Sequence, residues 1–299
     1  MFVVCGATGH TGKVVAETLL ARGRKVRAIA RTPERLQSLT SKGAEAFAAD
    51  FTDVDRLTKA FRGAEGAYVM VPPLSSSDDY RAFQDKVSDA IAGAVKNSGV
   101  KYVVSLSSFG VDKTEGTGPV VGLRNLELKL NQISGANCLH LRAGYFMTNT
   151  LPQAEAIRMM GMCVGPVRPD LKLPFLHTRD IGAAAADALL KLDFNGNQNR
   201  ELQGPRDLDY NEAASIIGKA IGKPELKYVQ IPDDQARQAM VQMGLSENFA
   251  RLILEMAAAL NSGHMRMLES RSARNTTPTP FEAFVAEDLL PLYRHPAAA

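Results

Sequence analysis

The stretch Gly6-Ala7-Thr8-Gly9-His10-Thr11-Gly12 decides the fold, because an apolar run at residues 2–5 leads into it and a segment of helical period, residues 11–21, follows it. Gly6 lets the chain turn tightly, Gly9 lets the backbone approach a pyrophosphate, and Gly12 permits close packing of helix on strand. The N–H groups and the positive dipole end at the start of the helix favour a phosphate there. Without a ligand, the same glycines would still form a tight turn. The sequence predicts a dinucleotide-binding turn, with candidate cofactor residues Gly6, Thr8, Gly9, His10, Thr11 and Gly12.

The rest of the first 145 residues alternates short β-branched apolar runs with amphipathic segments of helical period, which is typical of repeated βαβ units. Strands are predicted at 2–5, 25–30, 44–48, 66–71, 102–106 and 138–142, and helices at 11–21, 34–39, 54–61, 80–97 and 123–132. The apolar positions of the strands are nearly continuous, as expected when helices cover both faces of a parallel sheet. The sequence therefore predicts an α/β fold with a doubly wound parallel sheet of the Rossmann type, and a dinucleotide-binding domain over residues 1–145.

Beyond residue 145 the pattern becomes mostly helical. Helices are predicted at 151–160, 180–190, 210–220, 233–241, 247–260 and 281–290, and strand-like segments at 200–203 and 227–231. These segments predict a smaller, mostly helical cap over residues 146–299, which binds substrate, covers one end of the sheet and is interleaved with it.

Length and composition are those of an ordinary globular protein. The 299 residues include 35 lysines and arginines against 32 aspartates and glutamates, with 22% charged and 45% hydrophobic residues, which excludes disorder as the main state. The net charge of +3 comes from a small surplus spread along the chain, so it provides no basic patch for nucleic acid.

The cysteines and the N-terminal residues bear on the cellular compartment. Cys5, Cys138 and Cys163 lie far apart and form no C-x-x-C pair, so neither a disulfide framework nor a zinc site is indicated. No cluster has metal-ligand spacing, the first residues lack the pattern of a signal peptide, and no stretch approaches 18 uninterrupted apolar residues. The sequence predicts a cytoplasmic protein without a metal or a membrane segment.

The residue after the second predicted strand bears on the choice of nicotinamide cofactor. An NAD enzyme usually places a carboxylate there, which binds the ribose 2′-OH and repels a 2′-phosphate. Here the residue is Arg31, whose guanidinium can bind a phosphate and stack on adenine, and Arg35 could assist it. Glu34 nearby argues the other way, and Arg31 could also be a solvated residue at a helix start. The sequence favours NADP(H) over NAD(H).

The glycine spacing is G-x-x-G-x-x-G, and it resembles the cofactor fingerprint of the NmrA-like group of atypical short-chain dehydrogenases/reductases. Further segments that resemble this group are Ala30-Arg31-Thr32-Pro33, Ala49-Asp50-Phe51, residues 141–149, Thr178-Arg179-Asp180-Ile181-Gly182 and Leu202-Gln203-Gly204-Pro205. The resemblance covers nearly the whole chain. It implies that Asp50 and Phe51 flank the adenine, although Asp50 is also a good N-cap for the next helix. The group includes NAD(P)H quinone reductases, an NAD(P)H-dependent azoreductase, and redox sensors that bind NADP without turnover.

Other candidate residues lie where predicted strands end, because the carboxyl edge of such a sheet binds ligands. Val71 and Pro72 end the fourth strand, and alternation along the fifth strand makes Ser107 a candidate cofactor-side hydroxyl. Gly144 and Tyr145 follow the sixth strand and are expected near the nicotinamide. The expected substrate contacts are Tyr145, Phe146 and Asn149. Phe146 suits the core better than a substrate contact, and Tyr145 could equally find a buried partner.

The predicted helix at 123–132 lacks the Tyr-x-x-x-Lys proton relay of short-chain dehydrogenases that reduce carbonyls. Leu123 stands at the tyrosine position and Glu127 at the lysine position, and no tyrosine of the chain has a lysine four residues later. A ketone that receives hydride needs an enzymic acid, whereas a quinone becomes a delocalised phenolate that takes its proton from water. The sequence predicts NADPH-dependent hydride transfer to a quinone-like small molecule, with no catalytic residue assigned. The same absence fits a non-catalytic NADP(H) sensor, and a homodimer is compatible with either function.

Overall fold

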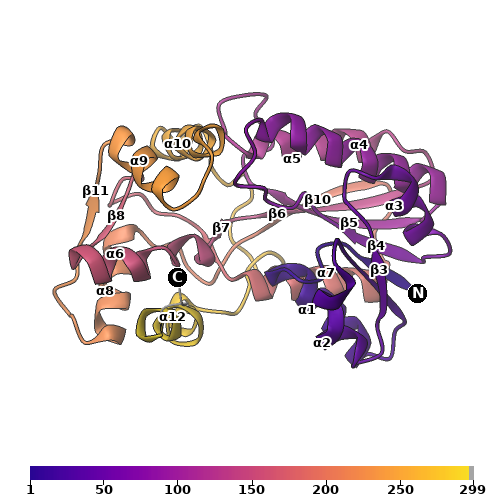
Figure 1. The fold of residues 1–299 in the computed structure, drawn as a ribbon, viewed down its shortest axis with the longest axis horizontal. Coiled ribbons are helices and arrows are strands. Elements are labelled where there is room, and N and C mark those ends of the chain that lie inside the picture. Colours follow the sequence, from indigo (N-terminus) through magenta and orange to yellow (C-terminus); the bar gives the residue numbers. More distant parts are fainter. Residues whose placement is uncertain (296–299) are drawn as a thin grey trace.

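A seven-stranded parallel sheet organises the larger part of the chain in this computed structural model, which describes residues 1–295 (Figure 1). Its strand order is β10-β6-β5-β4-β1-β2-β3, and every neighbouring pair is parallel. The strands are β1 (Phe2–Val4), β2 (Val26–Ala30), β3 (Glu45–Ala48), β4 (Gly66–Val69), β5 (Tyr102–Ser108), β6 (Asn137–Ala143) and β10 (Asn197–Leu202). The order reverses between β1 and β4, which creates the crevice where open α/β sheets bind ligands. The predicted doubly wound Rossmann fold is confirmed.

Helices cover both faces of this sheet. One layer contains α1 (His10–Ala21) and α7 (Thr178–Lys191), which pack on each other, and the other contains α3 (Val54–Phe61), α4 (Tyr80–Ser98) and α5 (Val120–Asn131) (Figure 1). Successive residues of β1 enter opposite layers: Phe2 and Val4 join the core under α1 and α7, and Val3 joins the core under α3 and α4. Burial on both faces explains the nearly continuous apolar strands.

Some predicted boundaries shift in the structure. The segment expected to be helical at 34–39 is a 3₁₀ turn, Pro33–Leu36, followed by the short α2 (Gln37–Thr40). The fourth strand, expected to reach residue 71, ends at Val69, so that Met70 begins the next loop. Proline at 72 and 73 cannot donate to a ladder, which limits the strand at this end.

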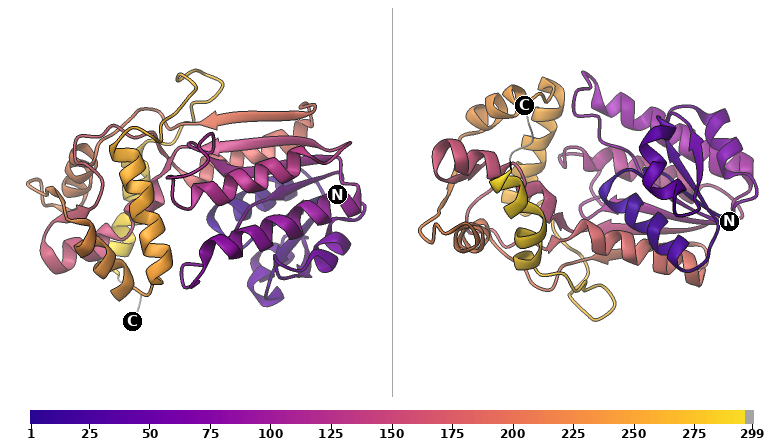
Figure 2. Two further views of the ribbon diagram at one scale, coloured as in Figure 1. Left: turned by 90° about the horizontal axis from the view of Figure 1, so that it is seen from above. Right: turned by 60° about the horizontal axis from the view of Figure 1, so that its bottom comes forward.

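The cap lies beyond one end of the sheet and has its own apolar core (Figures 1 and 2). Its elements are a 3₁₀ turn (Met147–Thr150), α6 (Gln153–Met160), β8 (Cys163–Gly165), α8 (Tyr210–Ile221), β11 (Tyr228–Gln230), α9 (Asp233–Gln242), α10 (Glu247–Asn261), α11 (Phe281–Phe284), a π-helical turn (Val285–Leu289) and α12 (Leu290–Arg294). β8 pairs with β11 in parallel, and β7 (Tyr145–Phe146) pairs with β9 (Phe175–Leu176). Within residues 1–295, no helix has both the length and the apolar character needed to cross a bilayer.

Two segments beyond residue 145 return to the sheet domain. α7 packs on α1, and β10 pairs along its whole length with β6, at the edge of the sheet. β10 begins at Asn197, three residues before the strand expected at 200–203. The prediction missed its first residues because they are polar and carry no apolar pattern. The chain thus crosses between the sheet and the cap several times.

Candidate functional site

The glycine turn joins β1 to α1 with the backbone that its residues were expected to allow. Gly6 has φ +63°, a left-handed conformation that favours glycine. A Cβ on Gly12 would lie 2.3 Å from the carbonyl oxygen of Gly6, so only glycine fits where the helix crosses the turn. Gly9 is the N-cap of α1 and offers no side-chain cap, which leaves the first-turn N–H groups open to an anion.

A cavity of about 260 Å³ lies directly over this turn, at the carboxyl ends of β1, β2, β3 and β4. Its lining residues are Gly6, Thr8, Gly9, Ile29, Ala30, Arg31, Arg35, Asp50, Phe51, Met70, Pro72, Pro73, Leu74 and Phe83. The candidates Gly6, Thr8, Gly9, Arg31, Asp50, Phe51 and Pro72 are therefore brought together in one crevice. Met70, Leu74 and Phe83 were missed, because nothing in their local sequence shows that the loop after β4 and the first turn of α4 close this cavity.

Arg31 and Arg35 give the cavity its positive charge. Both side chains are exposed, and neither forms an ion pair with a carboxylate of residues 1–295. The hydroxyl and the backbone amide of Thr52 donate to Asp50 Oδ1 at 2.6 and 2.9 Å. These hydrogen bonds, with a smaller contribution from the charge of Arg31, lower the pKa of the Asp50 carboxyl, while its partial burial opposes them. The site therefore contains two guanidinium groups that form no ion pair within residues 1–295, and one carboxylate that Thr52 holds by hydrogen bonds.

Other candidates lie beside or beneath the cavity. The buried Tyr68 hydroxyl donates to the hydroxyl of Thr11 at 2.8 Å, which ties α1 to β4. Val71 is buried in the core under α3 and α4, and His10 is exposed at the start of α1. These side chains support or flank the turn and do not line the cavity.

Ser107 at the end of β5 faces α5. Its hydroxyl donates to Glu127 Oε1 at 2.5 Å, and Arg142 of β6 binds both carboxylate oxygens, with Nε–Oε1 at 3.1 Å and Nη2–Oε2 at 2.7 Å. Glu127 is only 5% exposed. Glu127, which was expected at the lysine position of the relay, is thus a buried carboxylate paired with an arginine. Sequence reasoning singled out Glu127 and missed Arg142, because the pair joins a helix to a neighbouring strand.

The residues after β6 turn into the cap. A Cβ on Gly144 would lie 2.6 Å from the Pro174 carbonyl oxygen, so this glycine permits a close backbone approach. Tyr145 is 8% exposed and buried in the cap core, where its hydroxyl and that of Tyr210 hydrogen-bond at 2.8 Å. Burial raises the pKa of both phenols. None of these residues lines the cavity.

The two remaining candidates from this segment differ in exposure. Phe146 packs partly buried against the core under α1 and α7, and Asn149 is exposed. Neither side chain reaches the crevice over the glycine turn.

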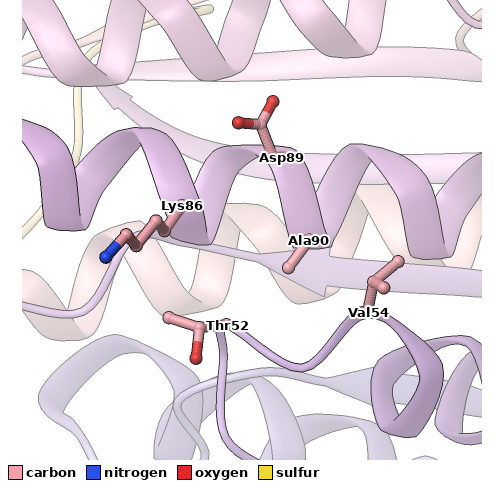
Figure 3. A pocket seen from close by; sticks show the side chains of 5 residues that line it. All are labelled: Thr52, Val54, Lys86, Asp89 and Ala90. Atoms are coloured by element: carbon pink, nitrogen blue, oxygen red, sulfur yellow. The ribbon is translucent and has the colours of Figure 1, made fainter.

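A second hollow, of about 470 Å³, lies on the surface between α4 and the start of α3 (Figure 3). Its lining residues are Thr52, Val54, Lys86, Asp89 and Ala90. Asp89 points away from Thr52 in Figure 3 and pairs with Lys129 at 2.6 Å. None of the glycines of the turn and neither Arg31 nor Arg35 lines this open depression, so the smaller crevice is the candidate site.

Comparison with known proteins gives the family. The profile of the NmrA-like family matches residues 1–285. The chain belongs to the NmrA-like family. This NmrA-like chain is 30% identical over 260 residues to the NAD(P)H azoreductase of Xenophilus azovorans, with 86% of each chain covered. It is 27% identical over 268 residues to Quinone oxidoreductase 2 of Escherichia coli (strain K12), with 88% of this chain and 89% of that protein covered.

Its fold is also similar to a solved structure with a dinucleotide. The NADPH-dependent quinone oxidoreductase of Escherichia coli complexed with NADPH superposes with a TM-score of 0.80 and 25% identity. The match covers 98% of the NmrA-like chain and 100% of that chain. The similarity therefore extends over both the sheet domain and the cap.

Proposed function

We propose that this chain is an NADPH-dependent oxidoreductase that delivers hydride to a quinone or a similar conjugated acceptor. The observation that carries the proposal is the crevice at the switch point of the sheet, lined by the glycine turn on one side and by Arg31 and Arg35 on the other. The anion-binding helix start and two guanidinium groups, which form no ion pair within residues 1–295, fit a dinucleotide with an extra phosphate.

The lining residues fit the parts of such a dinucleotide. The N–H groups at the start of α1 bind the pyrophosphate, Gly9 lets it approach the backbone, and Gly12 lets α1 pack closely on the turn. Arg31, assisted by Arg35, binds the 2′-phosphate. Asp50 and Phe51 flank the adenine, and Pro72 keeps the chain extended beside the cofactor. When bound, NADPH supplies the hydride.

The buried charge pair of Glu127 and Arg142 supports the choice of acceptor. The Glu127 carboxylate accepts a hydrogen bond from Ser107 and pairs with Arg142, so its oxygens are engaged within this buried cluster. A conjugated acceptor does not need a positioned acid, because its reduced form delocalises the charge and takes a proton from water. The names of the two curated relatives, an azoreductase and a quinone oxidoreductase, support the same class of acceptor.

Purified protein and the absorbance of NADPH test this function directly. NADPH consumption is followed with a panel of quinones and azo dyes, and we expect steady turnover with at least one class. Tight NADPH binding without consumption across the panel would overturn the reductase and favour a sensor that binds NADP(H) without catalysis. An absence of binding to either nicotinamide dinucleotide would overturn both functions.

A further inference from the structure

The loop between β4 and α4 forms one wall of the dinucleotide crevice. Pro72, Pro73 and Leu74 of this loop line the cavity. The loop continues to Asp79, the N-cap of α4, and contains a single internal turn in which the Ser77 amide donates to the Leu74 carbonyl at 3.0 Å. Its shape therefore depends on what else contacts it.

The start of α10 in the cap forms two hydrogen bonds with this loop and one with the first residue of α4. The Ser246 amide donates to the Ser75 carbonyl at 2.8 Å, and the Ser246 hydroxyl donates to the Ser77 carbonyl at 2.5 Å. The amide of Tyr80, in the first turn of α4, donates to Asn248 Oδ1 at 3.0 Å. The left view of Figure 2 shows α10 at the boundary between the cap and the sheet domain.

Aromatic rings continue the same contact to the cavity. The ring of Phe249 lies edge-on to that of Tyr80, with 4.7 Å between centroids and an angle of 79°. Tyr80 is buried, and its ring centroid lies 6.0 Å from that of Phe83, which lines the cavity. Packed rings and hydrogen bonds thus connect α10 of the cap to the cavity wall.

Ser246 serves both sides of this contact. Its hydroxyl oxygen caps α10 by accepting from the Phe249 amide at 3.0 Å, while its hydrogen goes to the Ser77 carbonyl. One side chain therefore fixes the start of the cap helix and the loop at once. Farther along α10, the Leu252 carbonyl oxygen lies 2.0 Å from where a Cβ on Gly118 would stand, so α10 also touches the loop after β5.

We propose that Ser246 and Asn248 are positioning residues for the dinucleotide. From the side of the cap, they hold in place the cavity wall formed by Pro72, Pro73 and Leu74. The inference rests on the proposed function. A wall that is already ordered does not have to be ordered at the moment of binding, which would cost conformational entropy. Because coupling between sites is reciprocal, bound NADPH also holds the start of α10 in place.

Substitutions at Ser246 separate its two hydrogen bonds. Ser246→Asp keeps an N-cap oxygen for Phe249 and has no hydrogen for the Ser77 carbonyl, whereas Ser246→Thr keeps both functions. Ser262→Ala is the matched control, because the Ser262 hydroxyl bonds Ala258 within the same helix, at the end far from the loop. By calorimetry with NADPH, Ser246→Asp should raise Kd at least about fivefold, because one hydrogen bond is lost and a carboxylate oxygen faces the Ser77 carbonyl oxygen. The Ser246→Thr and Ser262→Ala proteins should bind NADPH with the affinity of wild type.

Asn248 provides an independent variant. Asn248→Leu removes the acceptor of the Tyr80 amide and should raise the Kd for NADPH by a similar factor, while Asn248→Asp keeps an acceptor oxygen and should bind like wild type. Circular dichroism verifies that each variant is folded. Unchanged NADPH affinity in folded Ser246→Asp and Asn248→Leu would overturn the positioning role.

Hydrogen exchange on the wild-type protein tests the coupling without any substitution. NADPH should slow exchange at the amides of Ser246 and Phe249, and Ser262 should not respond. If NADPH binds but leaves both amides unchanged, the inference fails and the proposed function stands. If wild type does not bind NADPH in calorimetry, the proposed function itself fails.

Discussion

At the scale of single residues, Arg31 carries the choice between the two nicotinamide dinucleotides in the proposed site. Its guanidinium lines the crevice without a carboxylate partner in residues 1–295. Arg31→Asp should weaken NADPH binding by about 10- to 100-fold, as expected for lost charge-assisted hydrogen bonds, and weaken NADH much less. Calorimetry with both dinucleotides measures the difference, and Arg22→Asp at the exposed end of α1 is the control. Equal losses for NADPH and NADH would show that Arg31 does not bind the 2′-phosphate.

No residue with a Cβ fits at position 12 of the glycine turn. An added Cβ would lie 2.3 Å from the Gly6 carbonyl oxygen, which is backbone and cannot move away cheaply. Gly12→Ala should lower the free energy of unfolding in urea by about 1 to 3 kcal/mol. Gly9→Ala is the comparison, since its Cβ would stand 3.3 Å from the same oxygen, in an extended backbone that any residue adopts. We expect Gly9→Ala to keep the stability and lose NADPH binding. Wild-type stability in Gly12→Ala would contradict the steric argument.

At the scale of elements, a buried histidine joins β5, β6 and α5. His140 of β6 lies with Nδ1 at 2.6 Å from the Ser105 hydroxyl and Nε2 at 2.9 Å from Asn131 Oδ1. Because Asn131 Oδ1 can only accept, the ring hydrogen is assigned to Nε2, and Nδ1 therefore accepts from the Ser105 hydroxyl. Burial lowers the pKa of His140, against an opposing effect of the Glu127 charge. The folded state therefore favours the neutral ring.

This histidine gives the stability a definite dependence on pH. Because the pKa is lower in the folded state than its ordinary 6.5, the unfolded chain takes up a proton first as the pH falls. The contribution of His140 is fully present above pH 6.5 and is lost as the pH falls through the folded-state pKa. Urea unfolding across this range should show a shallower loss for His140→Gln than for wild type. His264→Gln, at an exposed histidine, should follow wild type, and a wild-type slope in His140→Gln would refute the assignment.

At the scale of the whole molecule, the sheet domain has two apolar cores and the cap has a third, and hydrogen bonds at the start of α10 link the cap to the loop before α4. A ligand that binds only the folded protein stabilises it by mass action. NADPH at about one hundred times its Kd should add about 2.7 kcal/mol to the free energy of unfolding, and scanning calorimetry should show one transition at a higher Tm. NADH at the same concentration should shift Tm less. Equal shifts for the two dinucleotides would contradict the preference for NADPH.

Features that depend on neighbours along the chain could be predicted from the amino-acid sequence alone. The order of apolar run, glycine turn and helix at residues 2–21 predicted β1 and α1, and the rhythm that follows predicted the parallel sheet. Arg31, Asp50 and Phe51 could be placed at one edge because parallel strands end on the same side. Periodicity, turn chemistry and position after a strand are local properties, so they can be read without knowing any distant contact.

Contacts between segments far apart in the chain became known from the folded structure. The polar start of β10 has no strand pattern of its own and is a strand because it pairs with β6. The Tyr145 ring lies in the cap core because aromatic residues from other elements surround it there. Ser246 reaches the Ser77 carbonyl across 169 residues of sequence. Such contacts form when whole layers pack and bury their apolar faces, and the free energy that selects them belongs to pairs of elements and not to any single stretch of chain.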